Sequence, residues 1–266
     1  SANCALYCGA KVDFVDIDLA TGNMSVSALT DKLISAKQNN CLPKVVIPVH
    51  LAGQSCDMKA IYDLSKQYGF KIIEDASHAI GAQYNGNKVG CCEFSDITVF
   101  SFHPVKIITS AEGGMAVTNN QQLAKKLQRL RSHGITNDSN EMTEPSHGPW
   151  YYQQIELGFN YRMTELQAAL GLSQLYKLDE FVTTRNAFAI SYSNAFKTMP
   201  LSHLKQLTQC YSSYHLYVVK LADEHSHLHR HIIEQLRSKG IVSHLHYIPI
   251  HTQPFYKAMG FKDSDY

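Results

Sequence analysis

Residues 98–115 read TVFSFHPVKIITSAEGGM and place Lys106 between two predicted strands. β-Branched and aromatic residues predict a strand that ends near Pro104, and the pair Gly113-Gly114 precedes the next strand. Lys106 therefore lies in a short turn. Apolar neighbours on both sides disfavour its charged form and lower its pKa, as a lysine that forms a Schiff base requires. From this stretch alone, a surface lysine on a hairpin stays open as the alternative.

A second stretch, KIIEDASH at residues 71–78, is a short apolar run that ends in the carboxylates Glu74 and Asp75. In open α/β sheets, ligands bind at the carboxyl ends of the strands, so Asp75 is placed for chemistry. Lys106 also follows a strand. Pyridoxal phosphate chemistry requires this pair of groups, because the lysine holds the aldehyde as an imine and the aspartate keeps the pyridine nitrogen protonated.

Four segments, in this order and spacing, resemble the sugar aminotransferases of the DegT/DnrJ/EryC1/StrS family. They are PVHLAGQSCDM (48–58), IIEDASHAIGA (72–82), FSFHPVK followed by TSAEGG (100–114) and LGFNYRMTELQAALGLSQL (157–175). The resemblance covers nearly the whole chain and implies a fold type I enzyme that uses pyridoxal 5'-phosphate. The fuller phrases SFHPVK, LRSHGIT and residues 150–175 most resemble members that aminate C4 of a UDP-linked 4-keto-6-deoxy-N-acetylhexosamine on the route to pseudaminic acid.

The resemblance implies a role for five residues. Lys106 would bind the cofactor and move a proton, and Asp75 would pair with the protonated pyridine nitrogen. His78 would touch the cofactor or orient Asp75, and a packing histidine is its alternative. Ser101 matches a serine that bonds the cofactor phosphate, against a strand serine satisfied by backbone. Asn160 matches an asparagine that reaches the cofactor of a neighbouring subunit, against a simple turn before a helix.

Three further residues are weaker candidates for substrate contact. His103 belongs to the SFHxxK pattern, and positioning the loop is an equal alternative. Tyr161 and Arg162 follow Asn160, and a planar guanidinium suits recognition of a diphosphate. With Asn160 serving a neighbour, the expected assembly is a homodimer with shared active sites.

The composition of the 266 residues, with 44% hydrophobic and 18% charged, predicts a soluble globular protein with a sizeable core. A net charge of +1 without a basic stripe argues against a nucleic-acid partner and against a membrane anchor. Seven cysteines without a CxxC pair argue against a disulfide framework and favour the cytoplasm. No metal site is expected, because the alternating histidines at 225, 227, 229 and 231 would spread around a helix.

The order of predicted elements indicates an α/β fold with a mainly parallel sheet flanked by helices. Strands are predicted at 11–16, 44–49, 71–75, 115–118, 214–221 and 242–248, and helices at 1–8, 24–38, 58–68, 121–133, 164–197 and 229–239. Residues 135–152 are predicted to form a long loop, for which a substrate lid is a hypothesis.

We therefore expect a large cofactor-binding domain at 1–163, a connecting helix at 164–199 and a small α/β domain at 200–266. Family members carry a preceding phosphate-binding turn and later elements that this sequence does not contain, so the chain is expected to be truncated at both ends. The predicted reaction moves an amino group from an amino acid, glutamate by resemblance, to a nucleotide-linked ketosugar. The alternative is an inactive cofactor-binding or interaction module. A sugar dehydratase is disfavoured, because those relatives replace the lysine with histidine.

Overall fold

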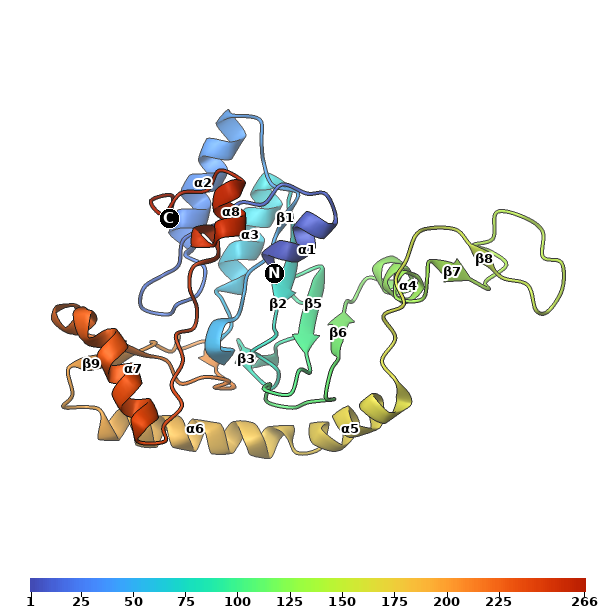
Figure 1. Cartoon of the computed structure of the whole chain (residues 1–266). Coiled ribbons are helices and arrows are strands. Elements are labelled where there is room, and N and C mark those ends of the chain that lie inside the picture. Colours follow the sequence, from blue (N-terminus) through green and yellow to red (C-terminus); the bar gives the residue numbers. More distant parts are fainter.

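The computed structural model describes residues 1–266, and its centre is a four-stranded sheet of order β1-β2-β5-β6 (Figure 1). β1, β2 and β5 are parallel, and β6 runs antiparallel to β5. The mainly parallel sheet expected from the sequence is therefore present. The bounds of these strands are β1 (Val45–Val46), β2 (Lys71–Asp75), β5 (Ile97–Ser101) and β6 (Gly114–Val117).

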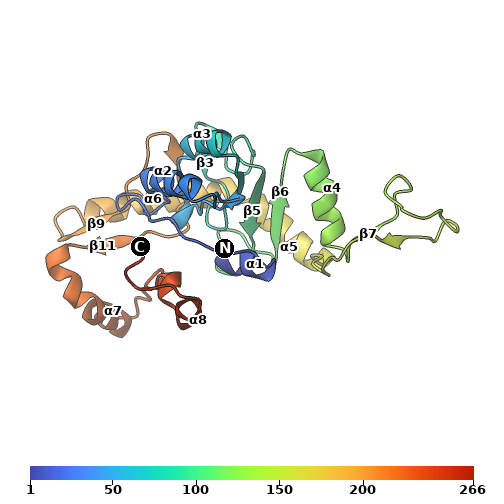
Figure 2. The ribbon, with the colours of Figure 1, turned by 90° about the horizontal axis from the view of Figure 1, so that it is seen from above.

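Two neighbouring helices, α2 (Val26–Gln38) and α3 (Met58–Tyr68), contribute to the main core of the sheet domain (Figures 1 and 2). α2 begins because Ser25 accepts a hydrogen bond from the Ala28 amide, and α3 begins at Asp57 in the same way. α3 ends at Gly69, which adopts the left-handed conformation. The buried core comprises Leu29, Leu33, Val46, Cys56, Met58, Ile61, Phe70, Ile72 and Tyr84.

A projecting arm follows the sheet. After α4 (Gln121–Leu130), the short strands β7 (Ile135–Thr136) and β8 (Gln153–Gln154) pair and flank a loop that extends from the body (Figure 1). We call residues 131–163 the arm. The predicted loop at 135–152 is therefore largely irregular, with β7 at its start.

A pair of helices, α5 (Glu165–Leu175) and α6 (Leu178–Ala195), runs below the sheet and leads into the C-terminal part (Figure 1). The helical segment predicted at 164–197, in which the sequence allows a break, consists of two helices divided at residues 176–177. The remaining elements are α1 (Ala2–Tyr7), η1 (Leu51–Gly53), β3 (Gln83–Tyr84), β4 (Asn87–Lys88), β9 (Leu201–His203), β10 (Cys210–Tyr211), β11 (Val219–Leu221), η2 (Asp223–Leu228), α7 (His229–Ser238), η3 (Ile250–Thr252) and α8 (Pro254–Ala258).

Four predicted strands are absent or shorter than expected. Residues 11–16 form no strand, because Phe14 packs on Tyr256 and no strand lies beside it for pairing. Residues 242–248 form none either. The predicted strand at 214–221 is reduced to β11, because Tyr214 adopts a positive φ of 45°. The strand at 44–49 keeps only β1 as a regular element.

The C-terminal part contacts the large domain at several places. β10 pairs antiparallel with β3, and the hydroxyl of Tyr256 donates a hydrogen bond of 2.6 Å to Asn3 Oδ1. The domain boundaries at 163 and 199 stay a prediction. None of the helices combines the length and the apolar character needed to cross a bilayer.

Candidate active site

Asp75 is the last residue of β2, and its carboxylate is held by two donors. The Ser77 amide donates to Oδ1 at 3.1 Å, and the Ser1 hydroxyl donates to Oδ2. Burial raises the pKa of Asp75, but these hydrogen bonds outweigh it and leave the pKa below its ordinary value. Asp75 is therefore ionised at neutral pH.

Lys106 lies in a turn after β5, where its amide donates to the carbonyl of His103 at 2.9 Å. Ile107 and Ile108, which follow it, are buried. Burial lowers the pKa of Lys106 below its ordinary value, and the charge of Asp75 acts in the opposite direction. The direction is the one that its apolar neighbours predict.

His78 follows β2 and its imidazole faces the same charges. The Ala52 amide donates to Nδ1 at 3.3 Å, so in the neutral ring the proton lies on Nε2. Burial, together with the charges of Lys106 and His246, lowers the pKa of His78 to about 4. At neutral pH His78 is therefore an uncharged N–H donor beside Asp75 and Lys106.

Two more histidines join this group from the C-terminal part, and sequence reasoning missed both. The ring centroids of His215 and His246 lie 4.4 Å and 5.6 Å from that of His78. Nδ1 of His215 and Nε2 of His246 are buried without a hydrogen-bond partner. The only signal in the sequence was the large number of histidines. It pointed to the alternating histidines at 225–231, where the structure has no group of side chains that could hold a metal ion.

The loop that carries His215 is fixed against α6 and η1. The guanidinium of Arg185 donates to the carbonyls of Tyr214 and His215 at 3.0 and 3.2 Å. Gly53 has a φ of 110°, and a Cβ there would lie 2.8 Å from the Tyr214 amide nitrogen. The close approach therefore requires glycine, and it brings His215 against His78.

Ser101 ends β5, and His103 lies in the lysine turn that follows. The His103 amide lies 3.5 Å from Ser101 Oγ, and His103 Nδ1 accepts from the Val105 amide at 3.3 Å. The exposed Nε2 of His103 lies 3.8 Å from Glu112 Oε1. Of the two alternatives for His103, these contacts support the positioning of the loop.

Asn160, Tyr161 and Arg162 lie on the arm and are exposed. Asn160 forms an isolated bridge with Ser132, and the Tyr161 amide donates to the Arg131 carbonyl at 2.9 Å. None of the three makes a hydrogen bond with Asp75, His78 or Lys106. Within one chain, the structure therefore joins the residues at the strand ends and leaves those of the arm apart.

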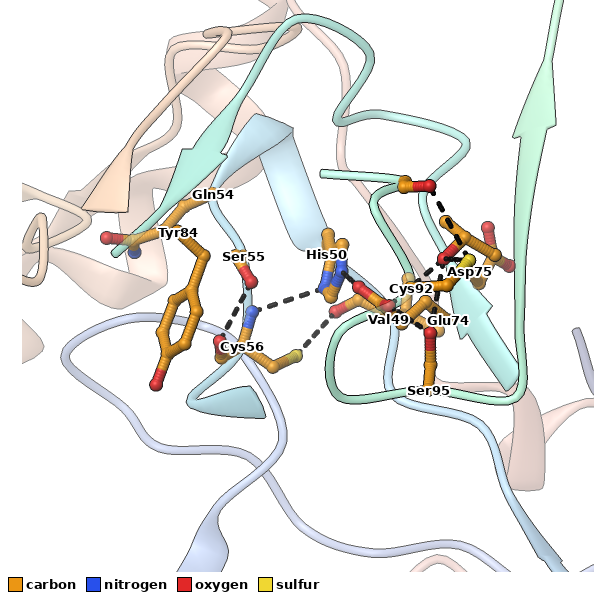
Figure 3. Close-up of polar contacts among 12 residues, drawn as sticks. Val49, His50, Gln54, Ser55, Cys56, Glu74, Asp75, Tyr84, Cys92 and Ser95 are labelled. Atoms are coloured by element: carbon orange, nitrogen blue, oxygen red, sulfur yellow. Dashed lines mark hydrogen bonds and ion pairs between the residues drawn. The ribbon is translucent and has the colours of Figure 1, made fainter. Parts of the chain in front are cut away.

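Glu74, the other carboxylate at the end of β2, is buried beside His50, Cys92 and Ser95 (Figure 3). Successive side chains of a strand point to opposite faces, so Glu74 and Asp75 diverge. The sequence indicated a pair of carboxylates, but only Asp75 belongs to the group around Lys106.

The chemistry of these donors fits pyridoxal phosphate. Lys106 offers an amine whose pKa is lowered, and Asp75 offers an ionised carboxylate for the ring nitrogen. The unpartnered nitrogens of His215 and His246 are further polar groups that a ligand atom would satisfy. Ser101 supplies a hydroxyl near the turn for the phosphate.

Comparison with known proteins places the chain in a family. The model of the DegT/DnrJ/EryC1/StrS aminotransferase family matches residues 1–265. A Campylobacter jejuni protein named UDP-4-amino-4,6-dideoxy-N-acetyl-beta-L-altrosamine transaminase is 38% identical over 260 residues, which are 97% of this chain and 65% of that protein.

Solved structures show the same relationship. Helicobacter pylori PseC, described as an aminotransferase involved in the biosynthesis of pseudoaminic acid, has a TM-score of 0.86 and 34% identity over 97% of this chain and 65% of its own. The PLP-form of the putative sugar aminotransferase Spr1654 from Streptococcus pneumoniae has a TM-score of 0.82 and 28% identity over 99% of this chain and 68% of its own. This chain spans about two thirds of the length of these relatives. The predicted fold class is confirmed, and the chain belongs to the DegT/DnrJ/EryC1/StrS aminotransferase family.

Proposed function

We propose that the protein transfers an amino group from glutamate to C4 of a UDP-linked 4-keto-6-deoxy-N-acetylhexosamine, in the synthesis of pseudaminic acid or a related surface glycan. The observation that carries the proposal is the partly buried Lys106, with its lowered pKa, under the influence of the ionised Asp75. The names of the Campylobacter relative and of Helicobacter PseC support the choice of sugar.

Pyridoxal phosphate is the cofactor that membership of this family indicates. When bound, it supplies an aldehyde that exchanges amino groups and a ring that withdraws electrons from the reacting carbon. Asp75 keeps the ring nitrogen protonated by pairing with it. Ser101 would bond the phosphate, and His78 would present its Nε2–H to the ring substituents or to Asp75.

Lys106 has two successive tasks. Its Nζ would hold the aldehyde carbon of the cofactor, and as a free amine it would be the base of the site. The free amine then removes the proton from the α carbon of glutamate, and in the second half of the reaction it returns a proton to C4 of the sugar. The lowered pKa increases the fraction of Lys106 that is uncharged and able to accept that proton.

The active sites are proposed to be shared in a homodimer, with Asn160 of one chain reaching the cofactor phosphate of the other. Its exposure on the projecting arm supports this arrangement, and Tyr161 and Arg162 beside it would approach the substrate diphosphate. We also propose a cytoplasmic location, which is supported by seven cysteines that all carry free thiols.

The test is incubation of the protein that contains these 266 residues with glutamate and UDP-4-keto-6-deoxy-N-acetylhexosamine. Mass spectrometry should detect an aminosugar, and alanine, aspartate and glutamine in place of glutamate identify the donor. Lys106→Ala is the control for background chemistry. Cofactor binding at Lys106 without any aminosugar would instead favour the inactive binding module.

A further inference from the structure

A buried pair of side chains, His50 and Glu74, lies next to the backbone of Asp75. His50 Nε2 lies 2.8 Å from Glu74 Oε2, and the two side chains are 0% and 7% exposed. The Cys56 amide donates to His50 Nδ1 at 3.2 Å, so the proton between the two side chains lies on Nε2 and is donated to Glu74. Figure 3 shows His50 between Cys56 and Glu74.

The other oxygen of Glu74 is satisfied by two hydroxyls. Thr98 Oγ1 donates to Oε1 at 3.0 Å, and Ser95 Oγ donates to the same oxygen. Burial raises the pKa of Glu74, but its hydrogen bonds with His50, Ser95 and Thr98 outweigh it and leave the pKa below its ordinary value. The pair therefore joins three segments, residues 48–56, β2 and the start of β5, through a buried carboxylate with hydrogen bonds to both oxygens.

The same segments hold the backbone of Asp75 on both sides. The Asp75 amide donates to the Pro48 carbonyl at 2.9 Å, and the His50 amide donates to the Asp75 carbonyl at 3.0 Å. A shift of residues 48–50 would therefore move Asp75. Catalytic groups need placement to about 0.5 Å, which side chains of this kind provide when their hydrogen bonds lock them.

We propose that His50 and Glu74 are positioning residues that set where the carboxylate of Asp75 lies relative to Lys106. The inference rests on the proposed function, because it assigns to Asp75 the ring nitrogen of the cofactor. Neither His50 nor Glu74 touches the reacting atoms. Both act on Asp75 through its backbone. Residues 48 and 50 are hydrogen-bonded to the amide and carbonyl of Asp75, and Glu74 directly precedes Asp75 in β2.

The experiment compares His50→Leu with His50→Gln. Leucine removes both hydrogen bonds of the imidazole, whereas the glutamine amide offers a donor for Glu74 and an acceptor for the Cys56 amide. Tyr84→Phe is the matched control, because it removes the partly buried hydrogen bonds of a hydroxyl, 2.7 Å to Asp57 and 3.2 Å from the Lys59 amide, and none of them involves β2. Thr98→Val, which removes one bond to Glu74, replaces His50→Leu if that variant does not fold.

Two readouts separate positioning from general stability. In cofactor-free protein, amide hydrogen exchange of the peptide 71–78 should be faster in His50→Leu and near normal in His50→Gln and Tyr84→Phe. With pyridoxal phosphate bound, the pH midpoint of its absorbance should rise by about one unit in His50→Leu, since a ring nitrogen that loses Asp75 withdraws fewer electrons. kcat should fall about ten- to hundredfold while KM is nearly unchanged.

Two results would overturn the proposal. One is a His50→Leu protein that melts earlier, as Tyr84→Phe does, with an unchanged absorbance midpoint and kcat. The other is normal exchange of residues 71–78 in the cofactor-free protein. If the wild-type chain holds no cofactor on Lys106, the proposed function fails, and the exchange measurement still decides whether His50 fixes Asp75.

Discussion

The strand ends and the arm place their candidate residues in opposite ways. Asp75 pairs with Val99 in the register of β2 and β5, so the sheet itself brings the end of β2 beside the start of the lysine turn. Asn160 and Arg162 instead lie exposed on a segment that is tied to the rest of the chain through its base. The candidate catalytic groups at the strand ends are therefore contributed by a single chain, whereas the groups proposed for binding are exposed on the arm.

The arm nevertheless has a defined base. Arg129 of α4 forms an ion pair of 3.0 Å with Glu141 and a second ion pair with Glu156. Its side chain is 18% exposed. Ion pairs of this kind fix the direction of a segment more than they add stability. The arm is thus oriented by ion pairs within its own chain, and its outer residues are mostly exposed.

The largest effect is expected from Lys106→Ala, which tests the residues at the strand ends. Loss of the amine that holds the cofactor and moves the proton should reduce kcat by at least about 10⁴-fold. Borohydride reduction and peptide mapping of the wild type should place the pyridoxyl mass on Lys106. A label on another lysine would contradict the assignment.

Asp75→Ala should have the next largest effect. It leaves a buried pyridinium without its partner, at a cost of about 3–5 kcal/mol, which corresponds to roughly a 10²- to 10⁴-fold loss of kcat/KM. Steady-state kinetics measure it, with Asp63→Ala on the exposed face of α3 as the control. Activity close to that of the wild type would remove Asp75 from the site.

A mixture of two inactive variants tests the arm. If Asn160 serves the neighbouring chain, Lys106→Ala and Asn160→Ala proteins that are unfolded and refolded together should recover about a quarter of wild-type activity. Random pairing makes half of the dimers mixed, and each mixed dimer has one intact site. Separately refolded proteins that are only combined afterwards serve as the control. No recovery would mean that Asn160 serves the active site of its own chain, and the contrast between the strand ends and the arm would then be wrong.

The smallest effect is a change in the pH dependence of stability. The unfolded chain has histidine pKa values near 6.5, whereas the pKa values of His78 and His215 in the folded chain are about 4 and 3. The unfolded state therefore binds more protons, and stability should fall as the pH drops from about 6.5 to 4. His215→Phe keeps the ring but removes one titrating group, so its Tm should fall less steeply. Thermal melts with His225→Gln as an exposed control check this, and an unchanged slope would refute the role of His215.

The sequence predicted those parts of the site that depend on one segment and its neighbours. Asp75 ends a short apolar run that predicts a strand. Pro104 and Gly113 lie on either side of Lys106 and predict the turn that contains it. The helices predicted at 24–38 and 58–68 are present as α2 and α3, because the caps that start them, Ser25 and Asp57, act through a contact over three residues. The parallel sheet followed from the alternation of these elements.

The rest depends on contacts between segments that are distant in sequence. His215 and His246 lie in stretches that alternate like strands, and nothing local reveals that both rings pack on His78. The failure at residues 11–16 has the same origin, since a β-like pattern becomes a strand only beside another strand. The burial of Glu74 against His50 could not be predicted either, because the face toward which a side chain points depends on what covers the sheet.

The hydrogen bond between Tyr256 and Asn3 joins residues 253 positions apart, and it has a consequence for synthesis on the ribosome. The chain emerges from its N-terminus, so the early strands can pair while His215, His246 and Tyr256 have not yet been translated. Contacts of such long separation form late and slow the folding rate. The nascent protein would therefore complete its sheet first and acquire the histidine group last, with Phe14 left uncovered until residues near 256 arrive.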